Sequence, residues 1–463
     1  MRLPKRCVTL TLAFMVLSGC ARNLAEVEDA YLPDASRAES RASSIVFVPG
    51  IMGVELHDSR TGRVVWGTFW ERDTSREDML SVALPFAIDR SVSSLEDSIV
   101  PGDELLVASL SVAGGQIHAR GYPGVLEGML QEIIEGGAHR HPKAISKDDA
   151  MAGRNPIMGF GYDWRRDIAT ETHRLHDAVV AASEERFART GSRRVDVIAH
   201  SMGTQLVRWY LRYGTAPVPA DGTLPKLTWA GAERIERALL VGGPNSGSAR
   251  ALKDVLEGAK MNPLLPRYAP AIVATFPSAF QLIPRPEDEL VVWANTGEPV
   301  PLYDIVTWRS LSWGPFHPNQ DGVLRALMPG AKTREERLRA LSRHVARCLA
   351  HARTFHRALD RPAEPPAHLQ VHVFAGDTRA TRSVLSVHPE TGEVDWIGDD
   401  PGDGTVTRQS ALGQSRSHPE APPRVRPATV HFNRGEHLGM LAEPEFLDAA
   451  LYLLLEAPDP PAP

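Results

Sequence analysis

The chain has 463 residues, of which 43% are hydrophobic and 23% charged, with 37 glycines and 37 prolines. This composition excludes a disordered, collagen-like or coiled-coil protein, and the length suits one large domain with insertions or two ordinary domains. The formal net charge is −6. Because binding to nucleic-acid phosphates needs a cationic face, no nucleic-acid partner is expected.

Residues 1–19 have the features of a secretory signal peptide, because a cationic start is followed by an apolar run over residues 7–17. The run is shorter than the ~20 residues that span a bilayer. It ends in a sequence that resembles the lipobox of bacterial lipoproteins, Leu17-Ser18-Gly19-Cys20. The resemblance implies cleavage before Cys20, acylation of Cys20 and, because Ala21 follows, an anchor in the outer membrane of a bacterial cell envelope. An ordinary signal peptide with an incidental cysteine is the alternative.

Three further segments follow the signal peptide. Residues 20–43 are rich in Ala, Ser and charge without apolar periodicity, which predicts a flexible tether with a span of roughly 25 to 30 Å. Residues 44–456 are expected to form a single domain, and residues 457–463 a Pro-rich, disordered tail. The tether would place the domain close to a membrane without inserting it.

Between the two ends, short apolar or β-branched runs alternate with amphipathic stretches. The expected strands are residues 44–48, 195–199, 238–241, 369–374 and 428–432. The expected helices are residues 170–189, 204–213 and 444–455. Nearly continuous apolar strands separated by helices favour a parallel sheet that is covered on both faces. The predicted class is therefore α/β, with a mostly parallel, doubly wound sheet.

Two stretches depart from this alternation, at about residues 57–155 and 256–365, and are expected to be insertions that form a cap. The first contains an expected helix around residues 125–134. The second contains a Pro-rich apolar run, residues 262–286, which near a membrane would favour a lipid substrate. It ends in a long helix with one apolar stripe: Leu338, Leu341, Val345, Cys348, Ala352, Phe355 and Leu359. Core packing of this stripe is favoured over a coiled-coil partner, with Cys348 as a buried apolar residue.

A candidate nucleophile, Ser201, lies where the strand at residues 195–199 meets a helical pattern. A serine on such a sharp strand-to-helix turn is a nucleophile elbow, which needs small residues two positions to either side; here these are Ala199 and Gly203. The helix N-terminus that follows favours negative charge developing nearby. An ordinary helix N-cap serine is the alternative.

A nucleophilic serine needs a base and an acid, which in this type of fold follow in the order Ser, acid, His. His437 is the predicted base, in preference to His431 and His418, because its loop follows the last expected strand at the carboxyl end of the sheet. Asp403, in a tight polar turn, is the predicted acid, with Asp377 as its competitor. Either aspartate could instead be an Asx-turn residue.

Two backbone donors are expected to form an oxyanion hole: the N–H groups of Met202, after the nucleophile, and of Met52, in the Gly-rich loop after the first strand. A Gly-rich strand end without this role is the alternative for the loop. No cofactor is expected. No metal site is expected either, because His139 and His141 lack a third spaced ligand.

Six motifs occur in one order over residues 44–456: Val46-Phe47-Val48-Pro49-Gly50-Ile51-Met52-Gly53, Gly161-Tyr162-Asp163-Trp164-Arg165, Ala199 to Gly203, Phe276-Pro277-Ser278-Ala279-Phe280-Gln281-Leu282-Ile283-Pro284, Gly402 to Val406, and Glu436-His437-Leu438. Together they resemble the lecithin:cholesterol acyltransferase-like family of α/β-hydrolases. The resemblance implies the α/β-hydrolase fold with helical cap or lid insertions. The paired cysteines found near the lid in animal members are missing here, and Trp66 is the one hint of a lid.

The same resemblance implies a serine acyl-enzyme mechanism on a lipid ester, with Ser201, Asp403 and His437 as triad and Met52 and Met202 as oxyanion donors. It assigns no chemistry to Asp163 and Trp164, which would be structural or near an acyl pocket. The expected protein is thus a membrane-tethered lipase, phospholipase or O-acyltransferase. The alternatives are a general carboxylesterase on soluble esters and a lipoprotein that keeps the hydrolase scaffold only for binding.

Overall fold

The computed structural model describes residues 44–67, 76–105, 109–112, 115–118, 122, 157–260 and 267–457. The predicted signal peptide, Cys20, the tether, the helix around residues 125–134, His139 and His141 lie outside these residues, as does nearly all of the predicted tail. No helix in the described part of the chain is long and apolar enough to cross a membrane.

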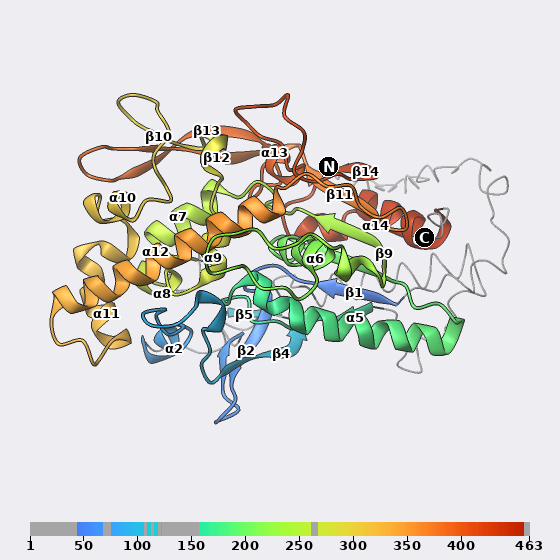
Figure 1. The fold of residues 1–463 in the computed structure, drawn as a ribbon, viewed down its shortest axis with the longest axis horizontal. Coiled ribbons are helices and arrows are strands. Elements are labelled where there is room, and N and C mark those ends of the chain that lie inside the picture. The colour runs from blue at the N-terminus through green and yellow to red at the C-terminus, as the bar shows by residue number, and fades with distance from the viewer. Residues whose placement is uncertain are drawn as a thin grey trace, which may run out of the picture.

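A six-stranded sheet with the order β14-β11-β9-β8-β1-β7 forms the centre of the molecule (Figure 1). Its strands are β1 (Ile45–Val48), β7 (Ile157–Gly159), β8 (Val195–His200), β9 (Ile235–Val241), β11 (Gln370–Gly376) and β14 (Thr429–Asn433). All neighbouring pairs are parallel. Every residue of β1, β8 and β9 is buried, as expected for strands covered on both faces. The predicted α/β class with a parallel sheet is confirmed.

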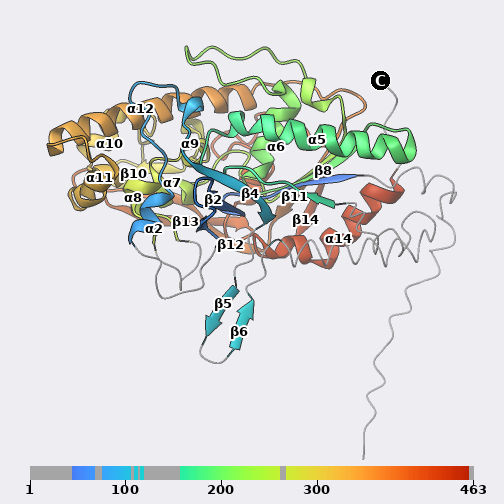
Figure 2. The ribbon, with the colours of Figure 1, turned by 90° about the horizontal axis from the view of Figure 1, so that it is seen from below.

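Helices cover both faces of this sheet (Figure 2). On one side lie α5 (Ile168–Thr190) and α6 (Gly203–Tyr213), and on the other lies α14 (Pro444–Leu451), which continues into a π-helical turn, Tyr452–Glu456. Asp167 caps α5 by accepting a hydrogen bond from the Ala169 N–H, and Gly191 ends it in the left-handed conformation. These three helices agree with the helices expected from the sequence.

Smaller sheets flank the central one. Strands β2 (Val54–Asp58), β3 (Val64–Trp66) and β4 (Ile99–Leu105) form one, and β5 (Ser109–Val112) pairs with β6 (Gly115–His118). A third sheet has the order β10-β12-β13, with bounds Val291–Trp293, Arg379–Val387 and Val394–Gly402. This third sheet was not predicted, although it leads directly to Asp403.

The remaining helices gather mainly at one end of the molecule (Figure 1). They are α2 (Arg76–Ser81), α7 (Ala249–Glu257), α8 (Pro270–Val273), α9 (Pro277–Gln281), α10 (Ile305–Ser310), α11 (Asp321–Leu327), α12 (Arg334–Leu359) and the short α13 (Arg408–Ala411). A capping box of Thr333 and Glu336 starts α12. Its predicted stripe packs into the core, and Cys348 is free and buried.

The Pro-rich run at residues 262–286 was expected to favour a lipid substrate, and its residues 262–266 lie outside the described part of the chain. Residues 271–285 are all buried. Phe276 and Phe280 pack on Trp164 and Trp308. This part of the run therefore contributes to the core, and the lipid preference expected from the run stays a prediction.

Candidate active site

Ser201 lies on the turn between β8 and α6 with a φ of 53°, the left-handed region that non-glycine residues rarely adopt. Its N–H donates to the carbonyl of Val241 over 2.9 Å, which ties the turn to the neighbouring strand. At Gly203 a Cβ would lie 2.5 Å from the Val48 carbonyl oxygen and 2.6 Å from that of Pro49. Only glycine fits there, so the small residue expected after the serine is required by close packing.

The structure brings the three predicted side chains together. His437 Nε2 lies 2.9 Å from Ser201 Oγ, and His437 Nδ1 lies 2.8 Å from Asp403 Oδ2. Because a carboxylate only accepts, Nδ1–H donates to Asp403 and Nε2 is left to accept from the serine hydroxyl. The imidazole is thus held in the tautomer that can remove a proton from Ser201.

The competing residues lie elsewhere. His431 stacks on Phe374 with ring centroids 4.6 Å apart and contacts Thr429. His418 donates its backbone N–H to Ser415. Among the residues that the structure describes, Asp377 makes no hydrogen bond with His437, in contrast to Asp403.

Asp403 follows β13 and is 2% exposed. Its Oδ1 accepts from the N–H groups of Thr405, at 2.8 Å, and Val406, at 2.7 Å. Burial raises the pKa of Asp403, but the His437 imidazole and these two N–H donors outweigh that effect, and the pKa lies below its usual range. The side chain is therefore a carboxylate at neutral pH.

The loop that carries His437 is fixed at several points. The His437 N–H donates to the Asp403 carbonyl over 3.0 Å, so acid and base loops are joined through their backbones as well. Asn433, at the end of β14, accepts from the Gly435 N–H and donates to the Met440 carbonyl. These bonds place His437 before any substrate is bound.

The two predicted oxyanion donors lie in the elbow and in the loop after β1. That loop abuts the serine, because a Cβ on Gly50 would lie 2.8 Å from Ser201 Cβ. Met52 has a φ of 64°, and Met202 is the N-cap residue that precedes α6. Within the described part of the chain, neither Met52 nor Met202 donates its N–H to a protein acceptor. Both donors remain available to a ligand.

Three aromatic side chains hold the loop after β1 and the start of β2 by donating to backbone carbonyl groups there. Tyr162 bonds to Pro49 at 2.8 Å, Trp66 to Met52 at 3.1 Å, and Trp164 to Val54 at 3.1 Å. Trp66 is 2% exposed and packs edge-on against Trp164. Trp66, the one hint of a lid in the sequence, thus supports this loop from within the core, and residues 68–75 that follow it lie outside the described residues.

Asp163, which lies between two of these aromatic residues, has a structural role. It pairs with the fully buried Arg165 at 2.7 Å, and Arg165 also binds Asp97 and the Val82 carbonyl. This arrangement fixes the segment that presents Tyr162 and Trp164.

A second hydrogen-bonded chain, which sequence reasoning missed, joins the loop after β1 to the loop of His437. His200 Nε2–H donates to the His437 carbonyl over 2.8 Å, since a carbonyl oxygen only accepts. His200 Nδ1 therefore accepts from the Tyr122 hydroxyl at 2.7 Å, and that hydroxyl accepts from the Gly50 N–H at 2.9 Å. Burial, and then the neighbouring His437, lower the pKa of His200 to about 3, so it stays neutral.

The position of His200 beside the nucleophile in an apolar strand was the one signal in the sequence for this chain. Nothing marked Tyr122, which is 78 residues away from His200.

The model of the family described as lecithin:cholesterol acyltransferase matches residues 151–318. The predicted resemblance to this family is confirmed. The match includes the Tyr162–Trp164 segment, Ser201 and the run before Pro284. It supports an enzyme that hydrolyses or transfers the acyl group of a lipid ester. No curated protein matches the chain.

Solved structures resemble the chain at low sequence identity. The Tle4–Tli4 complex matches at 14% identity with a TM-score of 0.56, covering 89% of this chain and 97% of that one. Lipase 1 from Pelosinus fermentans matches at 12% identity (TM-score 0.33; 90% and 100% covered). EstA from Clostridium botulinum matches at 11% identity (TM-score 0.32; 91% and 88% covered). The match to the Tle4–Tli4 complex shows a similar fold. The chain has the α/β-hydrolase fold.

Proposed function

We propose that this protein is a serine-dependent lipid acyl hydrolase or O-acyltransferase that works through an acyl-enzyme intermediate. The observation that carries the proposal is the continuous chain of hydrogen bonds from Ser201 Oγ through His437 to Asp403, at 2.9 and 2.8 Å. A buried carboxylate, an imidazole in the required tautomer and a hydroxyl on a strained turn form the arrangement needed to activate a serine.

In the first half of the reaction, Ser201 Oγ bonds to the ester carbonyl carbon while His437 Nε2 takes the hydroxyl proton. Asp403 stabilises the imidazolium, and the N–H groups of Met52 and Met202 donate to the tetrahedral oxyanion. The carbon–oxygen bond of the ester then breaks, and the leaving alkoxide takes the proton from Nε2. The acyl group remains on Ser201.

In the second half, His437 removes a proton from an incoming water or alcohol, which attacks the acyl carbon. Collapse of the second tetrahedral intermediate returns the proton to Ser201 Oγ and releases an acid or a new ester. A lipid ester as the substrate is supported by the family match over residues 151–318.

We also propose that Cys20 carries a lipid anchor in the outer membrane, which would keep the enzyme beside such substrates. The support is the lipobox-like sequence that ends at Cys20. Incorporation of labelled palmitate that persists in Cys20→Ala would contradict this part of the proposal.

The enzymatic proposal is tested with a fluorophosphonate probe, which phosphonylates an activated serine with loss of fluoride. Labelling is expected for the native chain and for Ser310→Ala, a serine on α10, and should be absent in Ser201→Ala. A folded native chain that takes up no probe would show a binding protein rather than an enzyme.

The products formed from a labelled substrate identify the acyl acceptor and the substrate class. A phospholipid with labelled acyl chains should give free fatty acid if water is the acceptor, and a sterol ester if an added sterol is. Turnover of soluble short-chain esters, with no product from phospholipid, would instead identify a general carboxylesterase.

A further inference from the structure

Although the whole chain has a formal charge of −6, α12 is strongly basic. Its 26 residues include seven arginines, and its two acidic residues both lie in the first turn. The apolar face of α12 packs into the core, so its charged residues concentrate on the side that faces solvent.

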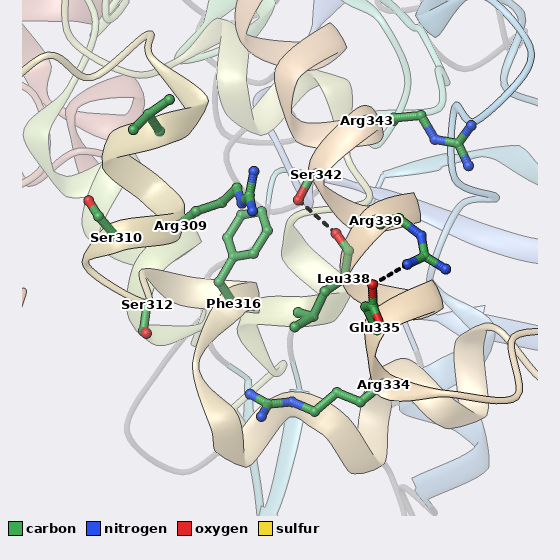
Figure 3. A pocket seen from close by; sticks show the side chains of 11 residues that line it. Arg309, Ser310, Ser312, Phe316, Arg334, Glu335, Leu338, Arg339, Ser342 and Arg343 are labelled. Atoms are coloured by element: carbon green, nitrogen blue, oxygen red, sulfur yellow. Dashed lines mark hydrogen bonds and ion pairs between the residues drawn. The ribbon is translucent and has the colours of Figure 1, made fainter.

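A groove of about 1070 Å³ lies between α12 and the α10 segment (Figure 3). Arg309 of α10 and Arg334 of α12 extend toward the space between the two helices, whereas the guanidinium group of Arg343, which also lines the groove, points away from Phe316 on the outer side of α12. Phe316 and Leu338 lie between the two helices as an apolar floor.

The charge in this groove is not neutralised by the protein. Glu335 is its one carboxylate, and Glu335 pairs with Arg339 on the same helix. Among the described residues, Arg309, Arg334 and Arg343 have no carboxylate partner, and all three are exposed. Three exposed arginines without a carboxylate partner therefore give the groove and its rim a positive potential, which favours an anionic ligand.

The type of anion follows from the rest of the lining. Guanidinium groups bind phosphate oxygens in a bidentate manner. The floor is apolar, and Val306 at the rim is 62% exposed, which suits the glycerol and upper acyl carbons of a lipid. The aromatic ring of the groove, Phe316, is only 6% exposed and offers no face on which a nucleic-acid base could stack.

We propose that the groove between α10 and α12 binds the phosphate headgroups of anionic phospholipids and so docks this end of the protein on a lipid surface. The groove lies at the α10–α11 end of the molecule, and none of its lining residues touches Ser201, His437 or Asp403 (Figure 1). The inference goes beyond the proposed function, because docking does not require a working triad.

The test is sedimentation of the full chain with lipid vesicles of phosphatidylcholine, with and without 30% phosphatidylglycerol. Cys20→Ala and Ser201→Ala are introduced throughout so that neither acylation nor lipid turnover contributes. The test variant is Arg309→Gln/Arg334→Gln/Arg343→Gln. The matched control, Arg60→Gln/Arg193→Gln/Arg382→Gln, removes the same charge from exposed arginines elsewhere.

Binding to the anionic vesicles is expected to exceed binding to pure phosphatidylcholine and to weaken as salt is raised. An arginine near an anionic surface contributes about a fivefold change in affinity, so the test variant should lose roughly 100-fold. The control should stay within about fivefold of the parent.

Three results would overturn the proposal: equal binding to both vesicles, a test variant that binds like the parent, or a control that loses as much. Displacement by inorganic phosphate or by an oligonucleotide at matched phosphate concentration would assign the groove to those ligands instead. When Ser201 is restored in both proteins, the test variant should hydrolyse a soluble short-chain ester at the same rate as the protein that keeps all three arginines. This readout separates failure of the groove from failure of the triad.

Discussion

The hydroxyl of Tyr122 connects two loops of the site, and Tyr122→Phe removes that oxygen alone. In the native protein the oxygen accepts from the Gly50 N–H at 2.9 Å and donates to His200 Nδ1 at 2.7 Å. Phenylalanine keeps the ring, which packs against Phe47 with centroids 5.5 Å apart. The substitution therefore tests two hydrogen bonds with little change in packing.

The expected cost follows from burial. Tyr122 is 7% exposed and His200 is 1% exposed, so no solvent replaces the missing oxygen. A buried polar group left without a partner costs about 1 to 3 kcal/mol, and two such groups predict a loss of roughly 2 to 6 kcal/mol in the free energy of unfolding. The Gly50 loop is also freed to move relative to Ser201. Displacement of an oxyanion donor by about 1 Å lowers kcat by roughly 100-fold, with less change in KM.

Stability is measured by urea unfolding, and kcat and KM with a soluble short-chain ester. The control is Tyr210→Phe on α6, which removes a part-buried hydroxyl that contacts the exposed His176 at 3.0 Å. The control should keep kcat and lose less stability than Tyr122→Phe, because water can replace the missing hydroxyl at His176. A Tyr122→Phe protein with native stability and native kcat would refute the view that this hydroxyl positions the loop.

Two further predictions concern stability. Ser201→Gly should be about 1 kcal/mol more stable than Ser201→Ala, because glycine adopts the φ of 53° without strain; equal urea midpoints would contradict this account of the elbow. His344 is held neutral when folded, because burial lowers its pKa from 6.5 to about 4. The unfolded chain takes up this proton as the pH falls below 6.5, so stability is lost from there towards pH 4, by up to about 1.4 kcal/mol per pH unit. His344→Gln should show a shallower decline in urea midpoints between pH 7 and 5, and an unchanged slope would rule out this histidine as the cause.

The sequence predicted the parts of the fold that rest on local pattern. Strands β8 and β9 are buried throughout and mostly apolar, because both faces of the central sheet are covered, and such runs are easily recognised. Strands β12 and β13 were missed, because β13 alternates partly buried and exposed residues and contains three aspartates and a proline. Strand β7 has only three residues, too few for any periodicity.

In the site, too, features that follow local sequence pattern were predicted and features that depend on long-range packing were not. The positions of Ser201 and His437 after strands of the central sheet could be read from the sequence, because parallel strands bring their carboxyl ends to one edge. Asp403 was recognised from its tight polar turn, because the strand β13 before it was missed. The contacts of Tyr122 and His200 could not, since they depend on how loops far apart in the chain pack together. The burial of Trp66 likewise depends on its partner Trp164, which is almost 100 residues away.

The pairing of β10 with β12 constrains how this enzyme could be remodelled. Strand β10 lies in the stretch that the sequence predicts to be an insertion, at about residues 256–365, yet it hydrogen-bonds to the hairpin whose far end delivers Asp403. Exchanging that insertion for the equivalent piece of another hydrolase would remove an edge strand from the support of the acidic residue. A chimaera designed to alter substrate selectivity must therefore exchange the β12–β13 hairpin together with the insertion, or retain the native β10 and place the junction next to it.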